Sequence, residues 1–292
     1  MANLKHFTEK IKSVTNTSKI TKAMKLVSTV KLKRAEDLAK QSKAYEDTIT
    51  GVLQEIALII KKYNASSTFG EIFDDSRPIH TLDIVFVTSD KGMCGSFNIK
   101  TIKAVLDTIK EYEKDKVKIR LKVAGKKGNS YFSYRGYSVV ETIHSASPDY
   151  KQAATFIAES VDDYNKGITD KIILIHNGFK NKLLQEIQRV DMLPFDVSSV
   201  QDVEVDSLLD VEPDNPKEIL NELVQKYIEF SMYFALIDSL AAEHSARMQA
   251  METATKNAGE VLKTLTTQYN KARQAGVTNE LIEIISGVEA MK

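Results

Sequence analysis

The residues best placed for chemistry lie in one glycine-rich segment, residues 89–96, which reads SDKGMCGS. The segment follows a β-rich run and precedes a helical pattern, which is where α/β proteins place a phosphate-binding turn. Its spacing fits neither the dinucleotide fingerprint nor the P-loop, so a tight turn is favoured over a nucleotide site. Cys94 within it is interpreted as a small buried side chain rather than as a nucleophile.

Other residue types that support catalysis or bind metal are scattered along the chain. The five histidines include no pair spaced four residues apart and no HExxH sequence, so we expect no metal site. No paired carboxylates and no arrangement of nucleophile and base stand out. We therefore expect a protein that is not an enzyme and that binds no cofactor.

Positive charge is concentrated near the N-terminus, although the whole chain is neutral. Residues 1–43 contain eleven Lys or Arg and three acidic residues, a net charge of +8 (11 − 3), which indicates an acidic partner. Nucleic acid is one alternative, because basic helices bind phosphate backbones. However, residues 19–34 contain no aromatic residue, and the apolar residues Ile20, Met24, Val27 and Val30 run through them. A protein partner with acidic loops is therefore favoured.

A long helix is predicted at the C-terminal end. All five prolines lie between residues 78 and 216, so both ends of the chain permit long helices. From Leu223 to Ala272, residues recur at alternating gaps of four and three, and only His244 and Thr255 among them are polar. This spacing is typical of a left-handed coiled coil. We expect a helix over about residues 217–287 and place His244 at the edge of the seam.

The N-terminal end carries a matching but less regular pattern. The stripe formed by Leu4, Phe7, Ile11 and Val14 resumes between Leu38 and Ile59, and the intervening stretch is basic. A helix over about residues 3–61 is predicted. It can pair antiparallel with the C-terminal helix, because a single compact insertion separates the two in sequence.

The insertion has an α/β pattern. Residues 82–88, 117–123 and 171–175 are β-rich, residues 138–140 form a weaker run, and residues 98–114 and 149–166 suit helices. Alternating strands and helices predict a mostly parallel, Rossmann-like sheet. The fold class is therefore mixed α+β and α/β, a long antiparallel coiled coil with an inserted domain. We expect domains at residues 1–62, 78–210 and 213–292.

Four motifs resemble those of the gamma subunit family of the rotary, proton-driven ATP synthase. Residues 20–27 (ITKAMKLV) are similar to its N-terminal signature, and residues 89–98 (SDKGMCGSFN) to its central motif. Residues 243–257 (EHSARMQAMETATKN) and 269–287 (YNKARQAGVTNELIEIISG) are similar to its C-terminal signatures. The resemblance covers the whole chain.

The resemblance implies a non-catalytic rotor shaft. Its partners would be a hexamer of alpha and beta subunits, the epsilon subunit and the membrane ring of c subunits. The protein would be peripheral, on the cytoplasmic face of the bacterial inner membrane. In this role, proton-driven rotation of the ring turns the shaft, which forces the beta catalytic sites through their cycle of ATP synthesis or hydrolysis.

The resemblance also implies site residues. Contacts between rotor and stator are expected at Met24, Lys22, Lys25, Lys31, Lys33, Arg34, Arg247, Gln274 and Thr278, and a contact with the ring at Glu212. Photosynthetic relatives carry an inserted dithiol switch, whereas this chain has only Cys94, so no intrachain thiol switch is expected. A coiled-coil tether without rotary coupling and a nucleotide-using α/β enzyme are the alternative functions.

Overall fold

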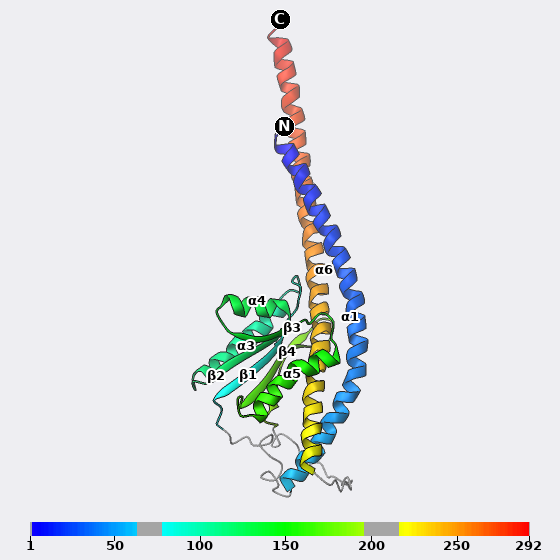
Figure 1. The fold of residues 1–292 in the computed structure, drawn as a ribbon. Helices are drawn as coiled ribbons and strands as arrows, with labels where there is room; N and C mark the ends of the chain where they lie inside the picture. The colour runs from blue at the N-terminus through cyan, green and yellow to red at the C-terminus, as the bar shows by residue number, and fades with distance from the viewer. Residues whose placement is uncertain (1, 63–77, 196–215, 292) are drawn as a thin grey trace. The chain divides into compact units, whose positions relative to one another are not determined.

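The computed structural model describes residues 2–62, 78–195 and 216–291 (Figure 1). The chain divides into two compact units. One comprises the residues up to Thr29 together with those from Arg247 onward, and the other runs from Val30 to Ala246. The helices α1 (Ala2–Lys62) and α6 (Pro216–Glu289) each contribute to both units. Their bounds agree with the two long helices predicted at the chain ends.

The larger unit contains a five-stranded sheet with the order β3-β2-β1-β4-β5. The strands are β1 (Thr81–Val87), β2 (Lys118–Ala124), β3 (Val139–Ile143), β4 (Lys171–Phe179) and β5 (Gln185–Leu193). The first four are parallel, and β5 pairs antiparallel with β4. The prediction of a mostly parallel sheet is confirmed. Strand β5, and with it the β4–β5 hairpin, was not predicted.

Helices cover both faces of the sheet. Phe132 of α4 (Lys126–Tyr134) and Val105 of α3 (Phe97–Glu113) pack on one face. On the other face, Phe156 of α5 (Tyr150–Asn165) and Ile228 of α6 share a core with β4. The predicted helices at residues 98–114 and 149–166 correspond to α3 and α5, whereas α4 was not predicted. Helix α5 begins where Asp149 accepts a hydrogen bond from the backbone N–H of Gln152 at 3.0 Å, a standard N-cap.

Part of α6 in the larger unit is buried on almost every side, from Ile228 to Ala246. One face packs with the α/β core. Another meets α1, where the rings of Tyr45 and Phe230 lie 4.4 Å apart between centroids and Lys43 lies over the Phe234 ring. A helix that is apolar on several faces needs such a double covering. His244 belongs to this buried stretch and is 7% exposed, so its predicted position at an edge was wrong.

In the smaller unit, α1 and α6 make polar contacts with each other. Thr21 and Thr255 bring their hydroxyl oxygens to 2.7 Å, and Lys25 Nζ lies 2.8 Å from Glu252 Oε1. The later residue of α1 pairs with the earlier residue of α6, so the two helices run antiparallel here. Supercoiling of the pair and the three predicted domain boundaries stay predictions.

Candidate partner-contact surfaces

The turn after β1 is closed by its own side chains. The backbone N–H of Ser89 donates to Asn98 Oδ1 at 2.9 Å, and Asn98 Nδ2 donates to Ser89 Oγ at 2.7 Å and to Cys94 Sγ at 3.3 Å. Cys94 is buried and packs with Ala242 and Ala246 of α6. Doubly wound sheets bind ligands where the strand order reverses, which here lies between β1 and β4. In this protein α6 side chains fill that position.

The neighbouring backbone amides bind a carboxylate of the chain itself. Asp90 accepts hydrogen bonds from the backbone N–H groups of Lys126, Ser145 and Ala146 at 3.0 to 3.2 Å. Lys126 is the first residue of α4, and helix N-termini of this kind bind phosphate in nucleotide-binding folds. Asp90 therefore occupies the place of an anion, which favours the tight turn over a nucleotide site. Cys94 is buried as predicted.

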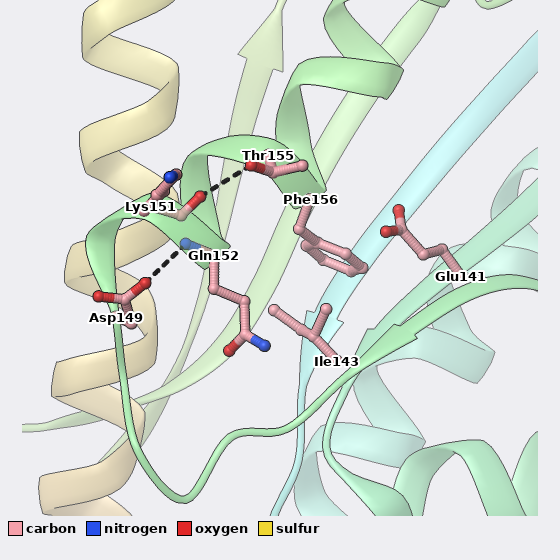
Figure 2. Close-up of a pocket in the computed structure, with 7 residues that line it drawn as sticks. All are labelled: Glu141, Ile143, Asp149, Lys151, Gln152, Thr155 and Phe156. Carbon is pink, nitrogen blue, oxygen red and sulfur yellow. Dashed lines mark hydrogen bonds between the residues drawn. The ribbon is translucent and has the colours of Figure 1, made fainter.

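A shallow pocket of about 350 Å³ lies between β3 and α5 (Figure 2). Its lining residues already have structural roles. Asp149 caps α5, the Thr155 hydroxyl donates to the Lys151 carbonyl at 2.9 Å, and Glu141 pairs with Lys122 at 3.2 Å. Nothing in this lining pairs a nucleophile with a base. Within residues 2–62, 78–195 and 216–291, no cluster of three metal-ligating side chains occurs.

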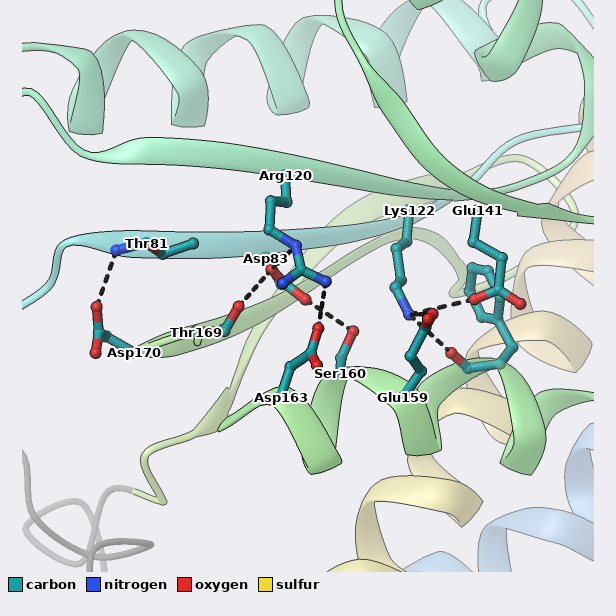
Figure 3. A network of polar contacts seen from close by, with 11 residues as sticks. Thr81, Asp83, Arg120, Lys122, Glu141, Glu159, Ser160, Asp163, Thr169 and Asp170 are labelled. Carbon is teal, nitrogen blue, oxygen red and sulfur yellow. Dashed lines mark hydrogen bonds and ion pairs between the residues drawn. The ribbon is translucent and has the colours of Figure 1, made fainter. Parts of the chain in front are cut away.

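Two groups of polar contacts fix α5 to the sheet (Figure 3). In the first, Asp83 is fully buried and accepts hydrogen bonds from Thr169 Oγ1 at 2.8 Å and Ser160 Oγ at 2.9 Å, and its Oδ1 lies 3.2 Å from Arg120 Nε. Arg120 also binds Asp163 at 2.6 Å. Burial raises the pKa of Asp83, although its hydroxyl and guanidinium partners oppose that shift.

The second group centres on Lys122, whose side chain is fully buried. Its Nζ lies 2.6 Å from Glu159 Oε2 and 3.2 Å from Glu141 Oε2. The two carboxylates respond differently. Burial raises the pKa of Glu141, whereas the hydrogen bond from Lys122 lowers that of the more exposed Glu159. Both groups of contacts are satisfied internally, so we assign them to the rigidity of the α/β core rather than to catalysis.

The pair of helices in the smaller unit has an inverted distribution of polarity. Over residues 20–28 the inner face of α1 is small and polar, with Thr21 and Ser28 only 8% and 3% exposed, whereas the half-buried residues nearer the start of α1 include Leu4, Phe7, Ile11 and Val14. The apolar Ile20, Leu26 and Val27 point outward and are 60%, 62% and 56% exposed. Small inner side chains allow two helices to approach closely. An apolar face left in water indicates a binding surface, which we call the α1 outer face.

Most residues that the family resemblance implied are accessible on the long helices. Lys22, Lys31, Lys33, Arg34, Gln274 and Thr278 are exposed, and Met24 is half-buried. Lys25 is paired with Glu252, and Arg247 is 7% exposed. Glu212 lies outside the described residues. The sequence did not lead us to expect that Leu26 points outward. Thr21 and Ser28 are seven residues apart and therefore share one helix face, and this spacing could have revealed the inner face and, with it, the outward direction of Leu26.

The end of α6 forms a second apolar surface. Its described residues after Gly276 are all exposed, and six large apolar side chains among them are between 51% and 62% exposed. These are Val277, Leu281, Ile282, Ile284, Ile285 and Val288. Within the smaller unit, α6 extends beyond the start of α1 (Figure 1). No described helix is both long and apolar enough to cross a membrane.

Comparisons with known proteins agree on one family. The family model described as ATP synthase matches residues 3–291. The ATP synthase gamma chain of Campylobacter curvus (strain 525.92) is 52% identical over 295 residues, and that of Aliarcobacter butzleri (strain RM4018) is also 52% identical over 295. Each alignment covers all of both chains.

Solved structures give the same fold. A chain of the Tetrahymena thermophila mitochondrial ATP synthase central stalk and c ring matches with a TM-score of 0.59 and 25% identity, over 80% of this chain and 99% of that one. A chain of the Euglena gracilis mitochondrial ATP synthase matches with a TM-score of 0.69 and 17% identity, over 99% of this chain and 95% of that one. With identity of about half over its full length to its bacterial relatives, this chain belongs to the ATP synthase gamma chain family.

Proposed function

We propose that this chain is the central rotor shaft of a bacterial ATP synthase and has no catalytic site of its own. The observation that carries the proposal is the apolar surface of the smaller unit, on the α1 outer face and at the end of α6. Six large apolar side chains between 51% and 62% exposed at a helix end need a partner that surrounds the helix. A hexamer of alpha and beta subunits supplies such a sleeve.

The basic face of α1 would meet the moving parts of the beta subunits. Lys22, Lys31, Lys33 and Arg34 are exposed on this helix, and acidic loops of beta would complement their charge. Met24 lies at the edge of the helix pair, where the rotor slides past beta. Gln274 and Thr278 are accessible to the part of the sleeve that grips α6.

Two of the proposed contact residues, Lys25 and Arg247, are already engaged within the chain. Lys25 can bind an acidic loop while it also pairs with Glu252, because the side chain of Glu252 is 60% exposed and the pair lies at the surface. Arg247 is buried in the isolated chain, so we assign it a supporting position beneath the contact with beta. Glu212 would contact the c ring, and the α/β domain would bind the epsilon subunit.

The remaining assignments complete the proposal. The two long helices form an antiparallel coiled coil, and the domains lie at residues 1–62, 78–210 and 213–292. The protein is peripheral, on the cytoplasmic face of the inner membrane, and it binds no nucleic acid. The c ring drives its rotation, which couples proton flow to ATP synthesis or hydrolysis at the beta sites.

Copurification tests this function. The full chain, tagged and expressed in its own host, should recover alpha, beta, epsilon and c subunits in a complex that hydrolyses ATP and pumps protons. Deletion of residues 277–292 should impair coupling, because it removes the apolar end of α6. A tether without rotary coupling would tolerate this deletion, so unchanged proton pumping by the truncated complex contradicts the shaft. Recovery of the chain without any ATPase contradicts the family role altogether.

A further inference from the structure

In the larger unit, the α/β domain packs on α6 through an apolar strip. Val224, Ile228, Met232 and Ala235 of α6 are each at most 1% exposed and share a core with α5 and β4. These residues recur every three or four positions, so they lie on one face of the helix. Apolar contacts are not directional. The close packing of the strip resists rolling of α6 about its own axis through shape, and directional polar contacts on its borders add to that resistance.

Polar contacts border this strip on one side at Glu229. Tyr150, the first residue of α5, donates its hydroxyl hydrogen bond to Glu229 Oε2 at 2.9 Å. Lys226 and Gln225 of α6 donate to the same carboxylate at 2.8 and 3.1 Å. Burial would raise the pKa of Glu229, but these hydrogen bonds outweigh it and the pKa is lowered. The carboxylate is therefore held as an anion in a fixed position.

Asp238 borders the strip on the opposite side. Its Oδ1 accepts a hydrogen bond from the backbone N–H of Phe179 at 3.0 Å, and its Oδ2 lies 3.2 Å from His176 Nε2. Both partners belong to β4. The fit is close, because a Cβ on Gly178 would lie 2.9 Å from Asp238 Oδ2. The end of β4 thus binds α6 directly.

Ser245 extends the second border along α6. Its hydroxyl donates to the Lys182 carbonyl at 2.9 Å and accepts from Gln185 Nε2 at 3.1 Å. At roughly 100° per residue, positions 238 and 245 lie within about 20° of each other around the helix. Position 229 lies roughly 180° from position 238, and the apolar strip runs between them. Rolling α6 in either direction therefore stretches a polar contact on one border.

We propose that Glu229, Asp238 and Ser245, with their partners in the α/β domain, form a clasp that transmits torque between the domain and α6. The proposal rests on the rotor function above and names the positioning residues within it. Along α6 the clasp extends from residue 229 to residue 245, or roughly 24 Å. The α/β domain and this part of α6 then turn as one body when the ring is driven.

The first test applies a load to the assembled enzyme. Membrane vesicles carrying the variant Glu229→Ala/Asp238→Ala should hydrolyse ATP at the wild-type rate when an uncoupler removes the proton gradient. Without the uncoupler, they should build a smaller pH gradient, because α6 rolls under load. The single variant Asp238→Asn, which leaves Glu229 intact and keeps an oxygen acceptor for the Phe179 N–H group, should build most of the wild-type pH gradient. Glu222→Ala, at an exposed carboxylate of the same helix, serves as the control and should match the wild type.

Two results of this test overturn the clasp. An equal loss of hydrolysis with and without uncoupler means that the residues serve only folding, and an unchanged gradient means that they bear no load. If the wild-type chain does not copurify with an ATPase, the proposed rotor function is wrong, and the proposed clasp is then wrong as well. The wild-type measurement thus separates the two failures.

A cross-link supplies the second test, because it replaces the contacts of Asp238 with a covalent bond. The variant Gly178→Cys/Asp238→Cys, in a Cys94→Ser background, places two thiols across the contact between β4 and α6. Under the proposal, the oxidised enzyme pumps protons at least as well as the reduced enzyme, because the cross-link replaces the lost Asp238 contacts and the two elements never separate during rotation. Pumping that stops on oxidation and returns on reduction would show that the domain must move along α6, which overturns the clasp.

Discussion

The buried carboxylate of Asp83 offers the sharpest test of how the α/β domain keeps its shape. Asp83 lies in the central strand β1, is fully buried, and accepts hydrogen bonds from Ser160 and Thr169, which are fully buried too. Replacement by Ala leaves both hydroxyls without this acceptor. It also removes one of the two carboxylates that contact Arg120, the other being Asp163. The packing of α5 on the sheet should weaken as a result.

The cost can be estimated from these contacts. An unsatisfied buried polar group costs about 1–3 kcal/mol, and breaking a buried ion pair costs about 3–5 kcal/mol. Two effects reduce the sum, since Arg120 keeps Asp163 and the desolvation that raises the pKa of Asp83 is removed. We expect a net loss of about 3 kcal/mol for Asp83→Ala. For Asp83→Asn we expect about 1 kcal/mol, because an amide oxygen still accepts a hydrogen bond.

Hydrogen exchange measures this loss within the full chain. Amides of β1, Thr81–Val87, should exchange about a hundred-fold faster in Asp83→Ala, because about 1.4 kcal/mol corresponds to a factor of ten. Amides of α6 beyond Arg247 belong to the other unit and serve as an internal control. Acceleration below about five-fold in β1, or equal acceleration in the Ala and Asn variants, would refute the reasoning.

Four further outcomes are expected. Burial raises the pKa of Asp83 in the folded protein. Relative to Asp83→Asn, the wild type should therefore be more stable below the usual carboxyl pKa of 3.8, and this advantage should disappear as the pH rises through the pKa of the folded state; urea unfolding across pH measures it. Lys122→Met should leave hydrogen exchange of the β2 amides within about ten-fold of wild type. Lys122→Ala should speed it more, because both variants leave Glu141 and Glu159 without Lys122 but only the Ala variant also leaves a cavity. Met24→Lys should lower protons pumped per ATP hydrolysed, because it adds a charge at the proposed contact between the rotor and beta, and undiminished pumping would contradict that contact. Cys94→Ser should leave ATPase activity equally insensitive to dithiothreitol and oxidant, and a redox response that Cys94→Ser abolishes would contradict the absence of a thiol switch.

The sequence predicted the elements whose periodicity is long or whose residues are strongly β-forming. The long helices were placed within two residues of their observed bounds, since repeated spacing over many turns averages out local exceptions. Strands β1 and β4 were found because they contain continuous apolar runs, and β2 because its apolar residues alternate with charged ones. Burial of Cys94 was predicted from its residue type alone.

The elements that sequence reasoning missed are those in which tertiary contacts override local pattern. Strand β5, which reads QEIQRVDML, is mostly polar because it lies at the edge of the sheet. Its strand conformation depends on pairing with β4, a tertiary contact that its own sequence does not indicate. Helix α4 begins with two lysines and a glycine, KKG. That Gly128 is required because a Cβ there would lie 2.8 Å from Phe86, Thr88 and Val123 side-chain atoms. His244 was misplaced because one helix face was expected to be buried, whereas α6 is covered on two.

The inverted polarity of the smaller unit explains why the long helices need an assembly around them. If Ile20 and Val27 faced inward, the pair would gain apolar burial of roughly 1.5–3 kcal/mol for each side chain. Instead Thr21 and Ser28 occupy the inner face, and the pair gives up that stability. The same apolar side chains then remain available to a partner, and the Thr21–Thr255 hydroxyl contact fixes the register in which they are displayed. A helix pair arranged in this way completes its apolar burial only inside a surrounding protein, as a shaft within a sleeve does.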